Sequence, residues 1–490
     1  MKRDKAEKAI SIVLVAIILV ASLLAFLIPP LITQKYDDEL IIYNWADYID
    51  LTVLDSFAEY YEELTGRSIK IVYSNFDTNE TMITEIIKGD SNIDLICPSE
   101  YAIERLLRNN ALQKLDWSVL DNYEVDSFTG NINSDILDVI NNVFVNMEVK
   151  SGETVDMADY FLPYMYGTLG VLYNTNYLTA EEVAKEGWGI FWNTLQNNDI
   201  QSKILIKDSI RDTYAAAVLY LQSFGLLPAK YMEMTVEELI NCTEDELVDL
   251  VEKSLKDQRQ YLKGYEVDFG KDDMVNEIAL VDLAWSGDAM YAIEEAMDDE
   301  GVSYLDYYVP EEGSNIWFDG WVMPKNAKNK DAAYLFMNYL CRPDIAMYNT
   351  LEIGYSAAVD NSSYFVEDEE DINYDYSVEA IEALLDCYEI YLEDFDTEEE
   401  YLEAVDEFYE EFFEDTRRYP DFEANLGMMT DFGEDNEKIV EMWERIKAYG
   451  ESDNWVVLGI IIGALALIVC SAIGFVIWHL NKKPKSRRVE

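Results

Sequence analysis

The chain has 490 residues, half of them hydrophobic, enough for two or more packed domains rather than a disordered tail. Its 97 acidic and 36 basic residues give a formal net charge of −61, which argues against nucleic acid as a partner because phosphate binding needs a basic surface. The single histidine, His479, stands near the C-terminus, so the body of the chain supplies neither a Ser-His-Asp triad nor a histidine-rich metal site.

Two long apolar runs frame the chain. Residues 9–34 and 455–480 contain no Asp, Glu, Lys or Arg, and each exceeds the about 20 residues that a helix needs to cross a bilayer. Basic residues before the first run and after the second predict that 1–8 and 481–490 are cytoplasmic and that the region between the runs lies outside. A cleaved signal peptide is the alternative for the first run, but its length and Pro29-Pro30 favour an uncleaved anchor.

The first part of the exported region alternates short apolar runs with helical patterns. Residues 40–43, 69–73 and 93–96 have the length of strands, and helical spacing follows each of them. Asp50 is placed to cap the first helix, and Gly66 is placed to end it. The order strand, helix, strand, helix, strand, helix predicts an α/β fold with a mostly parallel, doubly wound sheet.

Aromatic and acidic side chains gather where these strands end, which is where α/β sheets bind ligands. Tyr43–Tyr48 follows the first strand, and Cys97–Tyr101 follows the third. The same combination returns in Ile204–Asp212, Leu280–Trp285 and Asn315–Asp319. Carboxylates and aromatic faces suit an ammonium ion, whereas phosphate needs backbone N–H groups and basic side chains. The strand ends therefore predict a cation site.

Eight sequence blocks follow one another along residues 38–450. They are Tyr43-Asn-Trp45, Ser74–Met82, Asp94–Ser99, Trp285, Trp317-Phe-Asp319, Pro324–Lys330, Arg342–Ala346 and Ile353-Gly-Tyr355. Together they resemble the spermidine/putrescine-binding proteins of polyamine ABC transporters. This resemblance implies a two-lobed α/β periplasmic-binding-protein fold of type II, with two crossovers, that closes on an extended polyamine.

For such a fold both lobes are predicted to be discontinuous in sequence. Lobe 1 is expected to combine residues 36–160 and 318–358, and lobe 2 to combine residues 161–317 and 359–450. An acidic expansion at 366–415 falls in the second lobe. Apolar residues at helical spacing along it predict amphipathic helices with solvated acidic faces. The flanking transmembrane helices complete the predicted organisation.

The resemblance assigns eleven residues to the ligand-binding cleft. They are the ring and hydroxyl residues Trp45, Tyr48, Ser99, Tyr101, Trp285, Trp317 and Tyr355, and the acids Asp47, Asp208, Asp212 and Asp319. Asp212 and Asp319 are expected to pair with ammonium groups, while the indoles pack on methylene groups and make cation–π contacts. Ser209 replaces an acid of the spermidine binders, and Met429 replaces an amide of the family. These departures leave the choice between spermidine and putrescine open.

The sequence thus predicts the substrate-binding subunit of an importer at the cell membrane, with an extracellular or periplasmic ectodomain. Two spans are too few for a channel and no Walker A motif is present, so the permease and the ATPase are expected on separate chains. No metal is expected, because the cysteines lack metal spacing, and no cofactor is expected. No enzymatic activity is expected, because the carboxylates should be ionised and serve recognition rather than acid–base catalysis. The alternatives are the same fold binding a quaternary amine or a sugar, and a surface glycoside hydrolase with carboxylates about 5–10 Å apart.

Overall fold

The computed structural model describes residues 35–449 except 90, 299, 300, 367 and 396. The predicted membrane-spanning runs 9–34 and 455–480, and the predicted cytoplasmic termini, lie outside the described residues. Within the described part of the chain, no helix combines the length and the apolarity that crossing a bilayer requires.

The first lobe begins with three parallel strands, each followed by a helix. In chain order these are β1 (Asp38–Asn44), α2 (Leu51–Thr65), β2 (Ile69–Asn75), α3 (Asn79–Lys88), β3 (Leu95–Ile96) and α4 (Glu100–Arg108). β1 pairs in parallel with β2 and with β3. Asp50 caps α2 by accepting the N–H of Thr52, and Gly66 ends it at a φ of 68°, as predicted. The loops after β1 and β3 therefore meet at one edge of the sheet.

A continuous sheet joins the two lobes in the strand order β2-β1-β3-β11-β6-β9-β7-β8. The strands added beyond the first three are β6 (Phe161–Asn174), β7 (Ile204–Lys207), β8 (Leu262–Glu266), β9 (Val281–Trp285) and β11 (Ser314–Val322). β7 pairs in parallel with β8 and β9. β6 pairs antiparallel with β11 through its first half and with β9 through its second half. The sheet is parallel among β1, β2 and β3 and among β7, β8 and β9, and β6 and β11 pair antiparallel with each other where the lobes join.

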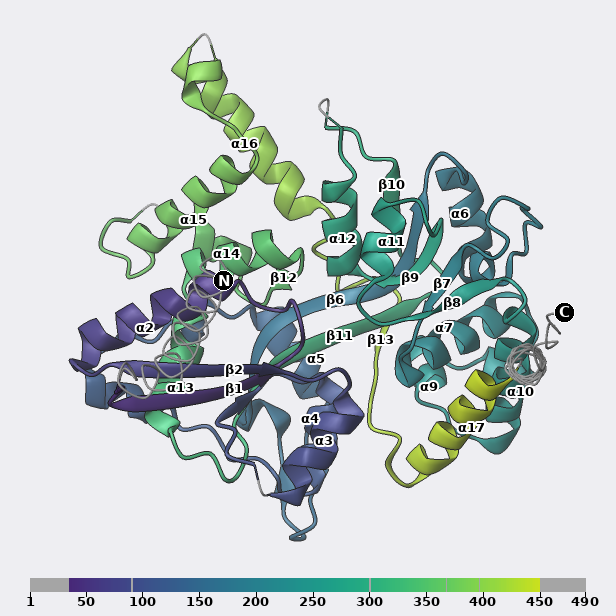
Figure 1. The fold of residues 1–490 in the computed structure, drawn as a ribbon, viewed down its shortest axis with the longest axis horizontal. Coiled ribbons are helices and arrows are strands. Elements are labelled where there is room, and N and C mark those ends of the chain that lie inside the picture. The colour runs from purple at the N-terminus through teal and green to yellow at the C-terminus, as the bar shows by residue number, and fades with distance from the viewer. Residues whose placement is uncertain (1–34, 90, 299–300, 367, 396, 450–490) are drawn as a thin grey trace, which may run out of the picture.

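Helices cover the sheet in both lobes (Figure 1). Those of the first lobe continue with α5 (Ser134–Val143), α13 (Lys330–Tyr339) and α14 (Pro343–Ile353). Those of the second lobe are α6 (Ala180–Glu186), α7 (Ile210–Ser223), α8 (Ala229–Met232), α9 (Val236–Ile240), α10 (Asp245–Gln258), α11 (Gly270–Val275), α12 (Ser286–Glu295) and α17 (Asn436–Ala448). Short strands complete the fold: β4 (Met147–Glu148), β5 (Thr154–Val155), β10 (Leu305–Tyr308), β12 (Ser356–Ala357) and β13 (Leu426–Met428).

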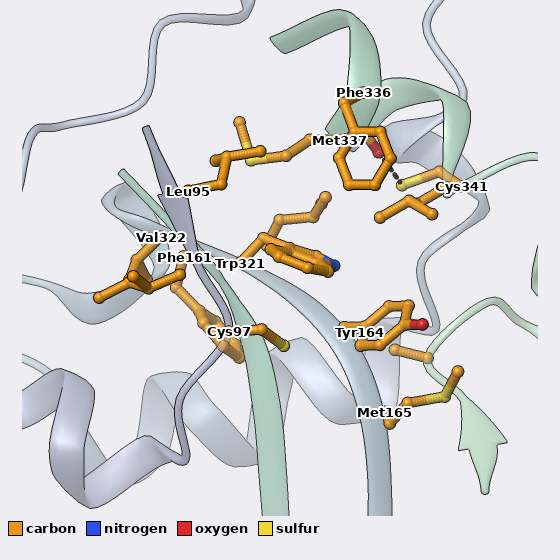
Figure 2. Packing of buried hydrophobic residues seen from close by; sticks show 14 of the residues in the cluster. Leu95, Cys97, Phe161, Tyr164, Met165, Trp321, Val322, Phe336, Met337 and Cys341 are labelled. Carbon is orange, nitrogen blue, oxygen red and sulfur yellow. Dashed lines mark hydrogen bonds between the residues drawn. The ribbon is translucent and has the colours of Figure 1, made fainter. Parts of the chain in front are cut away.

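Two large hydrophobic cores lie on either side of the junction. In the first, the indole of Trp321 packs between the rings of Tyr164 and Phe336, at centroid distances of 5.3 and 5.7 Å (Figure 2). Strand β6 belongs to both cores, because Tyr166 packs in the first and Leu169 in the second. The strands β6 and β11 are the two expected crossovers. The predicted lobe boundaries imply a third passage near residue 358, but the chain makes it later, where β13 leads into α17.

The acidic expansion packs against the first lobe, which differs from its predicted place in the second. Its helices are α15 (Tyr374–Cys387) and α16 (Glu398–Glu414), and both have an apolar side as predicted. α15 packs along α14, and Leu384 and Phe412 join the first core. α16 extends away from the body of the protein (Figure 1). Helical periodicity reveals an apolar face but not the partner that covers it, so the predicted lobe was wrong.

Candidate functional site

A cavity of about 550 Å³ lies between the two lobes. Its lining includes all eleven residues that the sequence assigns to the cleft. The topology explains why they converge, since Trp45 and Ser99 follow the parallel strands β1 and β3 of one lobe. Asp208 and Trp285 stand at the ends of the parallel strands β7 and β9 of the other. The carboxyl ends of both parallel sets thus face one space.

Strand β11 contributes one face of alternating residues to the cavity. Asn315, Trp317 and Asp319 are spaced two apart and all line the cavity, because successive strand side chains point to opposite faces. Asp319 also forms an antiparallel bridge with Ser99, and a bulge follows it in the pairing with β6. The sequence prediction missed Asn315, although its period-two spacing from Trp317 and Asp319 was a signal for it.

Asp319 is a buried acid with incomplete hydrogen bonding. Its exposed fraction is 6%, and burial raises its pKa to about 7 although Ser99 and Tyr48 favour the ionised form. Its Oδ1, the hydroxyl of Tyr48 and the indole Nε1 of Trp45 have no hydrogen-bond partner among the described residues. Buried polar atoms are usually paired, so the Oδ1 of Asp319 is an acceptor position that an N–H donor of a ligand can complete.

Aromatic rings form a continuous wall beside Asp319. The ring of Tyr355 packs edge-on against Tyr48 and against Trp317, at centroid distances of 5.2 and 5.5 Å. Gly287 permits this arrangement, because a Cβ at that position would lie 2.1 Å from the ring of Tyr355. The Ser-Gly-Asp sequence after Trp285 therefore serves close packing of α12 against the wall.

A buried lysine, Lys207, packs against the ring of Trp285. The Nζ of Lys207 lies 4.3 Å from the centroid of the Trp285 ring, 2.6 Å from Oε1 of Glu266 and 3.2 Å from Oδ2 of Asp288. Although burial opposes its charge, these carboxylates and the nearby Asp282 raise the pKa of Lys207 well above its usual range. We call Lys207, Glu266, Asp282 and Asp288 the Lys207 cluster; its acids have a cation supplied by the chain itself.

A second set of buried acids has no such cation. We call Glu100, Asp212 and Asp319 the Asp319 cluster; all three line the cavity. Among the residues that the structure describes, none of them forms an ion pair with a lysine or arginine, in contrast to the acids around Lys207. Burial raises the pKa of Asp212 and, together with Asp319, raises the pKa of Glu100 well above its usual value.

Arg211 stands near this cluster without neutralising it. Its guanidinium stacks on the ring of Phe432 at 3.7 Å and donates a hydrogen bond of 2.8 Å to Oδ1 of Asn241. Its charge favours ionisation of Glu100 and Asp212, but desolvation lowers the pKa of Arg211 itself. Asp208, by contrast, is already engaged, because it accepts from Nε1 of Trp443 at 3.2 Å and lies 3.4 Å from Nζ of Lys447.

One contact ties the two lobes together at the edge of the cavity. Arg105 of α4 forms an ion pair with Asp431, which precedes α17. Glu104 accepts the backbone N–H of Asp431 at 2.7 Å. The third chain passage is therefore fastened to the first lobe by charged hydrogen bonds.

Comparison with known proteins identifies the family of this arrangement. The profile of bacterial extracellular solute-binding proteins matches residues 56–372. The chain belongs to this family. Its match to the family and its likeness to solved relatives confirm the two-lobed α/β fold predicted for this solute-binding protein.

Individual relatives agree with that assignment. The putrescine-binding periplasmic protein PotF of Escherichia coli (strain K12) is 27% identical over 322 residues, which cover 65% of this chain and 77% of PotF. A spermidine/putrescine-binding periplasmic protein of Salmonella typhimurium is 25% identical over 320 residues, with the same coverage. The solved structure of a putative spermidine/putrescine ABC transporter from Listeria monocytogenes has a TM-score of 0.58 and 25% identity, covering 84% of this chain and 99% of its own.

The cleft of this solute-binding protein contains polar residues beyond the predicted eleven. Glu100, Asp288 and Asn315 line it as well, and Lys207 supports Trp285 from behind. Glu100 lies between the predicted Ser99 and Tyr101, at the start of a helix where an acid normally faces solvent. Its burial therefore has no local sequence signal.

Proposed function

We propose that this solute-binding protein captures a polyamine in the cavity between its lobes and delivers it to a separate ABC permease. The observation that supports this most strongly is the Asp319 cluster. Three buried carboxylates without an ion-pair partner are costly, because the charges of Arg211 and Lys207 only partly offset the lost hydration and leave the pKa of each acid raised. A ligand that brings its own positive charges relieves that cost.

The rest of the cavity suits the remaining parts of such a ligand. A polyamine alternates ammonium groups with methylene chains. Trp317 and Tyr355 offer apolar ring surface next to Asp319, and a ring face attracts a nearby cation by roughly 0.5–2 kcal/mol. The volume of about 550 Å³ lies within the range of small-molecule sites, about 300–1,000 Å³. The relatives named above as putrescine- and spermidine-binding proteins support the same ligand class.

The alternative ligands fit the charges less well. A sugar would stack on the indoles but would leave the carboxylates of Glu100, Asp212 and Asp319 without a counter-charge. A quaternary amine would supply the charge but has no N–H to donate to the unpartnered Oδ1 of Asp319. A glycoside hydrolase would need a paired acid and base, whereas the family consists of solute-binding proteins. We therefore assign the cavity to binding without chemical conversion.

The apolar runs at 9–34 and 455–480 act in this proposal as membrane anchors. Their lengths and flanking basic residues support a chain with both termini in the cytoplasm and the two lobes outside. The permease and the ATPase are separate chains. Deleting residues 455–490 is expected to reduce polyamine uptake by cells without changing ligand affinity, and unchanged uptake would argue against a role for the second anchor.

Calorimetry tests the ligand class directly. The full-length protein in detergent is titrated with putrescine, spermidine, glycine betaine and a short oligosaccharide. We expect saturable binding of one or both polyamines only. Asp319→Asn removes the charge of the central acid and is expected to bind polyamine more weakly. Asp55→Asn makes the same chemical change on the exposed side of α2 and is expected to bind like the wild type. Tight binding of betaine or oligosaccharide, with no polyamine binding, would overturn the proposal.

A further inference from the structure

Glu100 is a buried acid with an open hydrogen-bonding position in the cavity. It is the first residue of α4, and its exposed fraction is 1%. Its Oε2 accepts the backbone N–H of Phe318 at 3.1 Å. Its Oε1 has no hydrogen-bond partner within the described part of the chain. One oxygen therefore fixes the side chain, and the other is free to bind a ligand.

The bond to Phe318 places Glu100 beside Asp319, the next residue of β11. Oε1 of Glu100 and Oδ1 of Asp319 are both buried and unpartnered. The charge of Asp319 raises the pKa of Glu100 and that of Arg211 lowers it, while the charge of Asp212 raises the pKa of Asp319. Two neighbouring carboxylates in a buried site do not both ionise readily, so the pair retains a proton when no other cation is present.

The raised pKa values are consistent with this geometry. Burial and the charge of Asp319 raise the pKa of Glu100 well above its usual value, and burial raises that of Asp319 to about 7. The pair of acids therefore holds a proton more tightly than an isolated carboxyl group would. Arg211 opposes the effect, but its hydrogen bond goes to Asn241 rather than to Glu100.

We propose that Glu100 is a second carboxylate for the ammonium group at Asp319, and that binding exchanges a carboxyl proton for that ammonium group. This inference rests on the proposed polyamine-binding function. The ligand enters already protonated, its N–H groups donate to Oε1 of Glu100 and Oδ1 of Asp319, the O–H bond of the carboxylic acid breaks, and the proton passes to the buffer. The exchange favours an amine that carries N–H donors over a quaternary amine.

The number of protons released on binding tests the exchange. Full-length protein is titrated with putrescine at pH 7 in buffers of different ionisation enthalpy, and the slope of heat against that enthalpy counts the protons. We expect the wild type to release about one proton per ligand. Glu100→Gln keeps an acceptor for the N–H of Phe318, so it is expected to fold, to release less than half as many protons as the wild type, and to bind about tenfold more weakly.

The control makes the same substitution elsewhere. Glu59→Gln lies on the exposed side of α2 and is expected to leave affinity and proton release unchanged. The proposal is overturned if the wild type binds polyamine without releasing a proton, a result that does not depend on any variant folding. It is equally overturned if Glu100→Gln keeps both the affinity and the proton count of the wild type. Failure of the polyamine-binding function is a different result, since the wild type would then show no polyamine binding.

Discussion

The two sets of buried acids in this protein differ in where their positive charge comes from. The acids of the Lys207 cluster surround an ammonium group that belongs to the chain, with Nζ of Lys207 at 2.6 Å from Glu266 and 3.2 Å from Asp288. The acids of the Asp319 cluster form no ion pair within the described residues, and they line the cavity. Both clusters adjoin an indole ring: Trp285 in the first, and Trp317 two residues before Asp319 in the second.

The two clusters differ in how the cost of burying their carboxylates is compensated. Burying a carboxylate is unfavourable unless a cation and further hydrogen bonds compensate for the lost water. The Lys207 cluster meets this requirement during folding, so its acids contribute to a rigid support for Trp285. The Asp319 cluster leaves the requirement unmet in the empty protein, so its acids are available to an amine that arrives from solution. The Lys207 cluster thus has mainly a structural role, although its Asp288 also lines the cavity, and the Asp319 cluster is the proposed binding site.

The largest expected effect comes from removing the internal cation. Lys207→Met leaves the buried Glu266 without its partner and Asp288 with only Lys271, 3.8 Å away. Breaking a buried pair in this way typically destabilises a protein by about 3–5 kcal/mol. We expect a strongly lowered melting temperature, measured by calorimetric unfolding. The double variant Lys207→Met/Glu266→Gln should recover part of the loss. A variant as stable as the wild type would show that Lys207 is not needed to balance the cluster.

The next largest effect concerns ligand affinity. Asp319→Asn keeps the size of the side chain but removes its charge, and the loss of one member of a buried charge pair typically costs about 2–5 kcal/mol of binding energy. We expect polyamine affinity to fall roughly 100-fold, while Asp55→Asn binds like the wild type. Calorimetric titration measures both. An unchanged affinity in Asp319→Asn would remove this acid from the site.

A smaller effect is expected from pH. The pKa of Asp319 in the empty protein is about 7, so lowering the pH from 8 to 6 protonates most of the acid and should by itself weaken polyamine binding by about tenfold, with a larger loss where Glu100 also releases a proton on binding. The same raised pKa means that the unfolded chain ionises this acid first. Its contribution to stability therefore falls as the pH rises from about 4 to about 7 and is constant above that range. Equal affinities at pH 6 and pH 8 would contradict this account.

The smallest effect is expected at the edge of the cavity. Lys447 lies 3.4 Å from Asp208, and about a third of each side chain is exposed. Solvent screens such a pair, so Lys447→Met should change the free energy of unfolding by no more than about 1 kcal/mol. Chemical unfolding measures the change. A loss as large as that expected for Lys207→Met would mean that exposure does not separate the two kinds of ion pair.

The sequence was most informative where structure depends on neighbouring residues. Asp50 and Gly66 mark the ends of α2 through local capping, and the strand ends bring Trp45, Ser99 and Trp285 to one cavity. The sequence was least informative where burial depends on distant partners. The burial of Glu100 follows from its contact with Phe318, more than two hundred residues away. The packing of α15 depends on its contact with α14. The role of Lys207 depends on its ion pair with Glu266 of the neighbouring strand β8.

A structure of the full-length protein with bound putrescine or spermidine tests the central claim most directly. We expect an ammonium nitrogen within about 3 Å of Oδ1 of Asp319, with the methylene chain against Trp317 and Tyr355 and with Lys207 still paired to Glu266. A polyamine bound elsewhere, or one that displaces Lys207 while Asp319 stays unpaired, would contradict it.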